Sequence, residues 1–284
     1  ARVGTVSGTS ISFGTEVVFE AASSSFISST FDSSANKVVI GYQDSGNSSY
    51  GTAIVGTISG TNISFGTAVV FNAATTNAVV TTFDTNANKV VIIYEDSGNS
   101  SYTTAIVGTV SGTGISFGAE ALVAGNSNNT SESVCYDSTA QKVIVAFKSP
   151  ANSNYGSFVT GTISGTSITF TTVTTFNSAN TFLTSVSYDS NSNKVVASYA
   201  TTVSPYSGKS VVFTPNTFTL LRGQVASGSS ASVDIIGTVS TNQLSLTPGQ
   251  SYFVQTNGTL ALTAGTPSVF AGTAISATKL LVKT

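Results

Sequence analysis

The sequence is poor in the side chains that carry most protein chemistry. Its 284 residues include no His, Trp or Met, and Cys135 is the single cysteine. Catalysis by imidazole, metal sites built from Cys and His, and disulfides within the chain are therefore excluded. Only 8% of the residues are charged, the net charge is −2, and Lys and Arg form no cluster. Neither a nucleic-acid backbone nor an anionic membrane is an expected partner.

Long apolar segments are also missing, although the chain is apolar enough to fold. No uninterrupted apolar run approaches the roughly 20 residues of a membrane span, so membrane insertion is not expected. Hydrophobic residues still make up 40% of the sequence, including 17 Phe and 10 Tyr, which is unlike a disordered chain. The first residue is Ala1 rather than Met, which suggests processing or a fragment of a longer product.

A repeat of about 52 residues occupies most of the chain. An aromatic residue followed by Asp, a short polar turn and Lys-Val-Val or Lys-Val-Ile occurs four times, with the Asp at positions 32, 84, 137 and 189. A second signature, Val-Gly-Thr-Val/Ile-Ser-Gly-Thr, recurs from Val3, Val55 and Val107, and a Thr-Gly-Thr variant of it begins at Thr160. A fixed period of this length indicates a repeat architecture.

Each repeat has the pattern of four short strands, with no helical spacing. In the first complete copy the strands are predicted at 26–31, 37–42, 52–58 and 63–71. Residues 32–36 and 59–62 have the composition of tight turns, residues 44–50 form a longer connection, and residues 72–77 should carry the chain to the next repeat. Four antiparallel strands per 40 to 50 residues are typical of a β-propeller blade.

The two ends of the repeat region carry incomplete copies. Residues 1–19 supply strands three and four of a unit, at 3–6 and 11–19, while the last copy ends after a third strand at 208–212. An N-terminal strand that completes the last blade would close a ring of about four blades over residues 1–214 and remove the exposed sheet edges. The alternative is the tail of a longer propeller whose earlier blades precede Ala1.

A different pattern begins at Pro215. Short strands are predicted at 220–221, 233–239, 251–255, 260–262 and 274–282, and Asn257-Gly258 is a hairpin signal. The predicted fold class is therefore all-β. It combines a β-propeller of about four 52-residue blades, residues 1–214, with a small C-terminal β-sandwich or barrel module, residues 215–284.

The C-terminal module resembles the C-terminal module of structural proteins from marine tailed bacteriophages. The resemblance covers residues 217–284 and rests on Leu246-Thr-Pro-Gly-Gln-Ser-Tyr-Phe-Val-Gln-Thr-Asn-Gly-Thr-Leu260 and on the segment from Ala264 to Leu280. The upstream repeats are similar to propeller-like repeats of the same kind of protein. The resemblance implies a non-enzymatic tail or head fibre or appendage at the virion surface, a homo-oligomer, often trimeric, whose partners are other virion proteins. It implies no catalytic residue and no cofactor.

The repeated carboxylates are interpreted as structural. Each Asp of the repeat stands with a Lys at one tight turn, where a carboxylate caps its own turn backbone. In a glycoside hydrolase, two catalytic carboxylates would have to face each other across the glycosidic bond that is cleaved. With sparse carboxylates and no His, a polysaccharide depolymerase is the least favoured function. Cys135 is expected to be a small packed side chain.

The longer connections are the candidate ligand-binding surface. In a propeller they share a rim with the links between blades, and Tyr, Asn and Asp suit a host surface glycan, because rings stack on sugars and polar groups bond hydroxyls. The same Tyr residues could instead pack over their hairpins. Calcium in these loops is a less favoured alternative, with Glu95-Asp96 its best candidate, because one carboxylate per loop is few against the usual several. A secreted or cell-surface bacterial lectin or adhesin is the alternative to a virion protein. The candidate rim residues are Asp44, Asn47, Tyr50, Asp96, Asn99, Tyr102, Asn152, Tyr155 and Tyr206.

Overall fold

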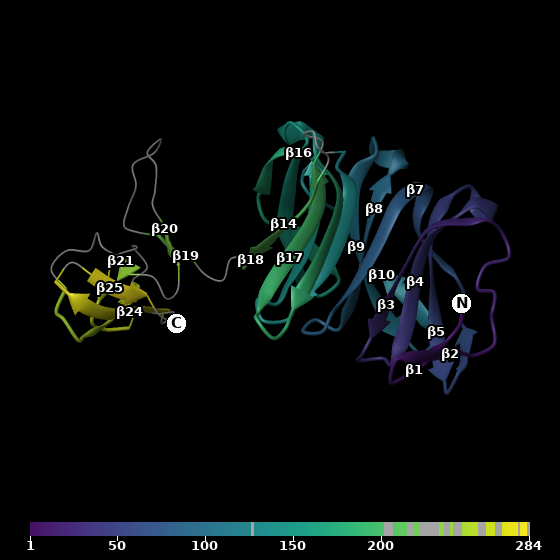
Figure 1. Ribbon diagram of the computed structural model, residues 1–284, viewed down its shortest axis with the longest axis horizontal. Helices are drawn as coiled ribbons and strands as arrows, with labels where there is room; N and C mark the ends of the chain where they lie inside the picture. The colour runs from purple at the N-terminus through teal and green to yellow at the C-terminus, as the bar shows by residue number, and fades with distance from the viewer. Residues whose placement is uncertain are drawn as a thin grey trace. The chain divides into compact units, whose positions relative to one another are not determined.

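The computed structural model divides into a repeat domain, residues 1–215, and a C-terminal module, residues 216–284. The residues it describes are 1–125, 128–201, 207–214, 219–221, 233–235, 239–240, 246–254, 260–264, 269–277 and 279–282. Within these ranges the regular structure is β-strand with three single-turn 3-10 segments and no α-helix (Figure 1), which confirms the all-β prediction. None of the described residues forms a helix long and apolar enough to span a membrane.

The repeat domain consists of four successive antiparallel units (Figure 1). Unit 1 contains β3 (Ser24–Asp32), β4 (Lys37–Asp44), β5 (Tyr50–Ser59), β6 (Asn62–Phe65) and the first half of β7 (Val69–Asp84). Unit 2 contains the second half of β7, β8 (Lys89–Asp96), β9 (Tyr102–Ser111), β10 (Gly114–Phe117) and β11 (Ala121–Leu122). Unit 3 contains β12 (Thr130–Asp137), β13 (Lys142–Ser149), β14 (Tyr155–Ser164), β15 (Ser167–Phe170) and the first half of β16 (Thr174–Asp189). Unit 4 contains the second half of β16, β17 (Lys194–Thr201) and β18 (Ser207–Phe213).

The links from unit 1 to unit 2 and from unit 3 to unit 4 are bent strands, β7 and β16, rather than separate connections. The predicted link at 72–77 lies inside β7, whose first half pairs with β5 and whose second half pairs with β8. The step occurs at a register shift between Asn77 and Val80, where Ala78 has a φ of 49°. Such a bulge turns the backbone while most of its hydrogen bonds are kept. The predicted strand at 63–71 is correspondingly two elements, β6 and the start of β7.

Consecutive units pack face to face, so an interior sheet is buried on both sides. On β8, Val90, Ile92 and Tyr94 belong to a core shared with unit 1. The alternate residues Val91 and Ile93 belong to a core shared with unit 3. A strand that is buried on both faces needs a continuous apolar run rather than an alternating one. This explains the Lys-Val-Val or Lys-Val-Ile signature that marks the second strand of every unit.

The N-terminal segment packs on unit 1 and does not close the domain. The strands β1 (Gly4–Ser7) and β2 (Ser10–Phe13) pair only with each other, and β18 pairs only with β17. Among the described strands, then, no pairing forms the predicted ring, and every sheet is open. The physical reason lies in the contacts of Phe19 with Tyr42, at 5.2 Å between ring centroids, and with Phe65, at 5.9 Å. They repeat those that Phe71 makes with unit 2 and hold the segment on unit 1.

The C-terminal module contains a five-stranded antiparallel sheet and a separate pair of strands. The sheet has the order β21 (Val239–Ser240), β25 (Lys279–Val282), β24 (Val269–Ser276), β22 (Ser251–Val254), β23 (Leu260–Ala261), and the pair is β19 (Thr219–Leu221) with β20 (Val233–Ile235). Its core includes Leu246, Tyr252 and Leu280. The predicted strand at 274–282 is instead the end of β24, a turn and β25. The Asn257-Gly258 turn lies outside the described residues.

The close approach of neighbouring units at Gly66 yields a first prediction. A Cβ on Gly66 would lie 1.9 Å from the backbone oxygen of Thr113 in the next unit, and the equivalent atom on Gly118 would lie 2.0 Å from that of Thr166. Backbone cannot give way as a side-chain end can, so Gly66→Ala should lower the free energy of unfolding by about 1–3 kcal/mol. Urea unfolding measures the change.

A matched glycine serves as the control. Gly114 has its nearest atom, the Ser111 backbone oxygen, 3.7 Å from an added Cβ. Gly114→Ala should therefore leave the urea midpoint nearly unchanged. Equal effects of the two substitutions would contradict a role for Gly66 in the contact between units.

Candidate functional site

The longer connections of units 1 to 3 form the same rigid turn. Each contains one 3-10 turn: η1 (Ser45–Asn47), η2 (Ser97–Asn99) or η3 (Pro150–Asn152). Asp44 and Asp96 accept hydrogen bonds from the Gly46 and Gly98 amides at 2.9 Å, whereas η3 begins with Pro150 and has no side-chain cap. A left-handed Ser ends each turn. Asp44 and Asp96 therefore stabilise the backbone of their loops and do not project from them.

These turns lie at the same end of the sheets as the links between units. The Thr76 amide donates to the Ser49 carbonyl at 3.0 Å, and the Thr181 amide donates to the Asn154 carbonyl at 3.0 Å. In unit 2, Asp96 also accepts from the Asn72 Nδ2 of the preceding link at 3.0 Å. We call the surface formed by η1, η2, η3 and these links the rim. Backbone hydrogen bonds join η1 and η3 to the links that follow them, and a side-chain bond joins η2 to the link that precedes it.

The predicted site residues divide into three groups in the structure. Asp44 and Asp96 are buried at 9% and 5% exposure, so their carboxylates are turned into the fold. The exposed members are Asn47, Asn99 and Asn152, and the half-buried ones are Tyr50, Tyr102 and Tyr155. Tyr206 lies outside the described residues. The rim thus presents one exposed Asn amide and one partly exposed Tyr ring from each of units 1 to 3.

At the opposite end of the sheets, the tight turns have the structural role predicted for them. The Asp32 carboxylate accepts from the amides of Ser34 and Ala35, each at 2.9 Å. The equivalent bonds recur at Asp84 and Asp137. Lys37 does not pair with Asp32, since its Nζ donates to Thr57 Oγ1 at 2.9 Å. The one ion pair among the described residues joins Arg2 and Glu16 at the surface.

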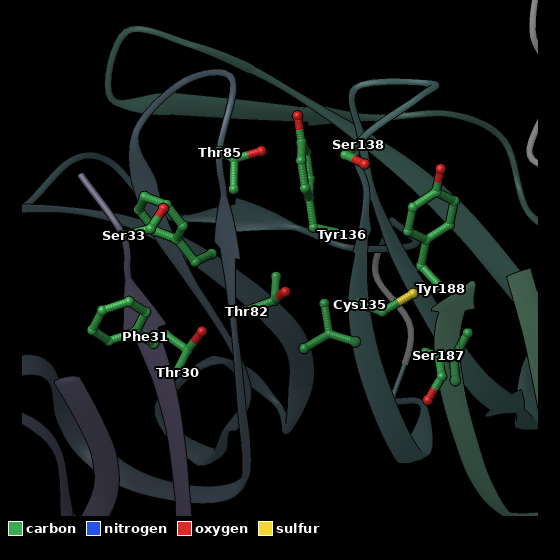
Figure 2. A pocket seen from close by; sticks show the side chains of 13 residues that line it. Thr30, Phe31, Ser33, Thr82, Thr85, Cys135, Tyr136, Ser138, Ser187 and Tyr188 are labelled. Atoms are coloured by element: carbon green, nitrogen blue, oxygen red, sulfur yellow. The ribbon is translucent and has the colours of Figure 1, made fainter. Parts of the chain in front are cut away.

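Beside the tight turns lies a groove that the sequence reasoning missed (Figure 2). It has a volume of about 670 Å³ and crosses all four units. The first strands that form it are held together by side chains: Ser28 Oγ accepts from the Thr81 amide, and Ser133 Oγ accepts from the Val186 amide, both at 3.0 Å. The lining residues are Thr30, Phe31, Ser33, Thr82, Phe83, Thr85, Val134, Cys135, Tyr136, Ser138, Val186, Ser187 and Tyr188.

The repeat itself contained a signal for this groove. The aromatic residue before each repeated Asp lines it in every unit, at positions 31, 83, 136 and 188, and a hydroxyl residue after the Asp lines it at 33, 85 and 138. These positions were interpreted only as markers of the turn. Cys135 takes the place of the Thr or Ser of the other units, and burial, with the Asp137 charge, raises the pKa of its thiol to about 12.

The first strand of unit 3, β12, contains a buried acid. Glu132 is 8% exposed, and its Oε1 accepts from Thr103 Oγ1 at 3.1 Å. The Thr103 hydroxyl accepts in turn from the Asn129 amide at 3.2 Å. Burial raises the pKa of Glu132 to about 7, and the charge of Glu95 acts in the same direction, although the hydrogen bonds oppose it. Glu132 is therefore a group whose charge changes near neutral pH.

The sequence matches no protein-family model and no curated protein.

The raised pKa of Glu132 predicts a pH-dependent stability. The pKa is about 7 in the folded chain against 4.5 for the ordinary group, so the folded state holds the proton more tightly. This stabilisation is complete below about pH 4.5 and is lost as the pH rises through 7. At pH 8, Glu132→Gln should be more stable than the wild type by up to about 3 kcal/mol, and the difference should vanish at pH 4.5.

Urea unfolding of both proteins between pH 4.5 and 8 measures this difference. Thr61→Ala is the control, because it alters an exposed side chain and removes no titratable group. A stability difference between wild type and Glu132→Gln that does not change with pH would contradict the assignment.

Proposed function

We propose that the protein is a non-enzymatic structural protein of a bacteriophage virion, a tail or head fibre or appendage, that binds a host surface glycan. The observation that carries the binding role is the repetition of one rigid turn, with an exposed Asn and a half-buried Tyr, at the same end of units 1 to 3. Weak sites repeated on one body bind a repetitive surface with high avidity. The resemblance of residues 217–284 supports the virion assignment.

We also propose that the repeat domain is a β-propeller of about four blades. In support, each of units 1 to 3 is a complete antiparallel meander, and neighbouring first strands β3, β7, β12 and β16 contact one another in sequence order. Units that pack face to face around adjoining first strands are the arrangement of propeller blades.

The chemistry of the carboxylates favours binding over catalysis. Asp32, Asp84 and Asp137 are each bound by turn amides. Within the described residues no three Asp, Glu or Cys side chains come together as a metal site would require. The bonds from the turn amides commit one oxygen of each carboxylate to its own turn, which is a structural role. A secreted or cell-surface lectin or adhesin is the alternative and would use the same surfaces.

The rim assignment predicts the effect of removing its rings. Replacing Tyr50 and Tyr102 together with Ala should weaken binding to host cells or their purified glycan by roughly threefold to tenfold per site, because stacking area is lost. Binding to immobilised host polysaccharide measures the change, and the melting temperature should stay near that of the wild type.

Thr61→Ala is the control for this pair, since Thr61 is exposed on the hairpin between β5 and β6. Unchanged binding by the double variant would contradict the rim assignment. Release of new reducing ends from the polysaccharide would instead overturn the non-enzymatic assignment.

The assembly role of the C-terminal module makes a separate prediction. The full chain should be an oligomer, and a version that ends at residue 214 should be monomeric, since the virion proposal makes residues 215–284 the assembly device. Light scattering coupled to size exclusion gives both masses. Two monomers would favour a secreted lectin and contradict the assembly role.

A further inference from the structure

The groove beside the tight turns has a lining with no charged side chain. All of its 13 residues are apolar, aromatic, hydroxyl-bearing or the single Cys135. The lining residues come from equivalent positions of four consecutive units, so the same kinds of side chain recur along the groove. Figure 2 shows the labelled side chains as a series, from Phe31 and Ser33 of unit 1 to Tyr188 and Ser187 of unit 4. A lining of this kind offers a similar set of contacts several times along its length.

The rings of the groove differ in how far they are available to a ligand. Phe31 is 50% exposed, whereas Phe83 is 7% exposed and belongs to the core between units 1 and 2. Tyr136 and Tyr188 are half-buried. The Tyr188 hydroxyl lies 2.6 Å from Thr139 Oγ1, which fixes its ring beside the tight turn of unit 3. The groove therefore has an exposed ring at one end, an anchored ring at the other and hydroxyl groups between them.

The electrostatic surroundings of the groove disfavour an anion. The carboxylates of Asp32, Asp84 and Asp137 are buried directly beside its lining residues. Their effect reaches the groove, since the charge of Asp84 adds to burial in raising the pKa of Tyr136 to about 12. Two Lys side chains of these turns are bonded to third-strand hydroxyls, Lys37 Nζ to Thr57 Oγ1 at 2.9 Å and Lys142 Nζ to Thr162 Oγ1 at 2.7 Å. No cation from the lining could offset these negative charges.

We propose that this groove is a second binding site, at the end of the sheets opposite the rim, for a neutral polysaccharide that lies across the units. Rings that stack on sugar faces and hydroxyls that bond sugar hydroxyls are the groups such a ligand requires. A chain of identical sugars meets equivalent contacts in consecutive units, so several weak contacts act together. The proposal rests on the proposed function in one respect, which is that the protein binds glycans.

The test compares neutral with anionic polysaccharides on the full chain. The probes are soluble mannan, dextran and agaro-oligosaccharides, with alginate as the anionic counterpart, and binding is measured by affinity electrophoresis. Ser138→Trp places a large side chain in the groove at an exposed turn position, and Phe31→Ala removes the exposed ring. We expect binding of at least one neutral probe. It should weaken at least tenfold with Ser138→Trp and about threefold to tenfold with Phe31→Ala.

Ser64→Trp is the matched control, because Ser64 is exposed on β6 and does not line the groove. It should bind like the wild type, and the melting temperatures of all variants should be compared. Cys135 gives a readout without substitution, since it is the only cysteine and lies in the groove. The bound neutral probe should slow its reaction with methyl methanethiosulfonate.

The outcomes separate this inference from the proposed function. A neutral probe that binds equally to wild type and Ser138→Trp, leaves Cys135 unprotected and is weakened by replacing Tyr50 and Tyr102 would overturn the groove but keep glycan binding at the rim. Preference for alginate, or no binding of any neutral probe, would overturn the ligand class. Detection of the protein on purified virions would then still support the virion assignment, which does not depend on the groove.

Discussion

The repeat domain depends on the burial of both faces of each interior sheet. An interior unit exposes little of either face, because one face packs on the preceding unit and the other on the following unit, as the alternate residues of β8 show. Both cores consist mainly of Val, Ile, Phe and Tyr. Apolar burial is the dominant favourable contribution to folding. Because apolar contacts between units occupy the faces of the interior sheets, the polar and charged residues of these units gather at the two ends of the sheets.

The two ends use their polar residues differently. At the rim, Asp44 and Asp96 fix the backbone of a turn, and the exposed groups are neutral amides and Tyr rings. At the other end, Asp32 and its equivalents fix the tight turns, and neutral side chains line the groove. In units 1 to 3 the Asp carboxylates at both ends are buried while uncharged groups face outward. This division explains how a chain with only 8% charged residues can present polar surfaces suited to uncharged ligands.

Much of the fold was accessible from the sequence because its signals are local. The period of 52 residues, the tight turn after Phe31 and the strands on either side of it follow from turn chemistry and apolar patterning, which need no knowledge of distant contacts. The bend within β7 was missed, since Ala78 carries no residue-type signal for a left-handed backbone. The site prediction was limited in the same manner. From the sequence, Asp44 in a polar loop looks like an exposed ligand-binding residue. Only the hydrogen bond that it accepts from the Gly46 amide identifies it as the cap of the turn.

The sequence by itself determined the all-β class, the four repeats and the structural role of the repeated Asp, because each is encoded within a few neighbouring residues. Only the tertiary structure decided where the N-terminal segment packs, that no described strand pairing closes the domain, and that four first strands meet along one groove. The physical reason is that these features depend on how a unit packs against its neighbour. Phe19 illustrates this, since its position depends on contacts with Tyr42 and Phe65, which lie 23 or more residues away along the chain.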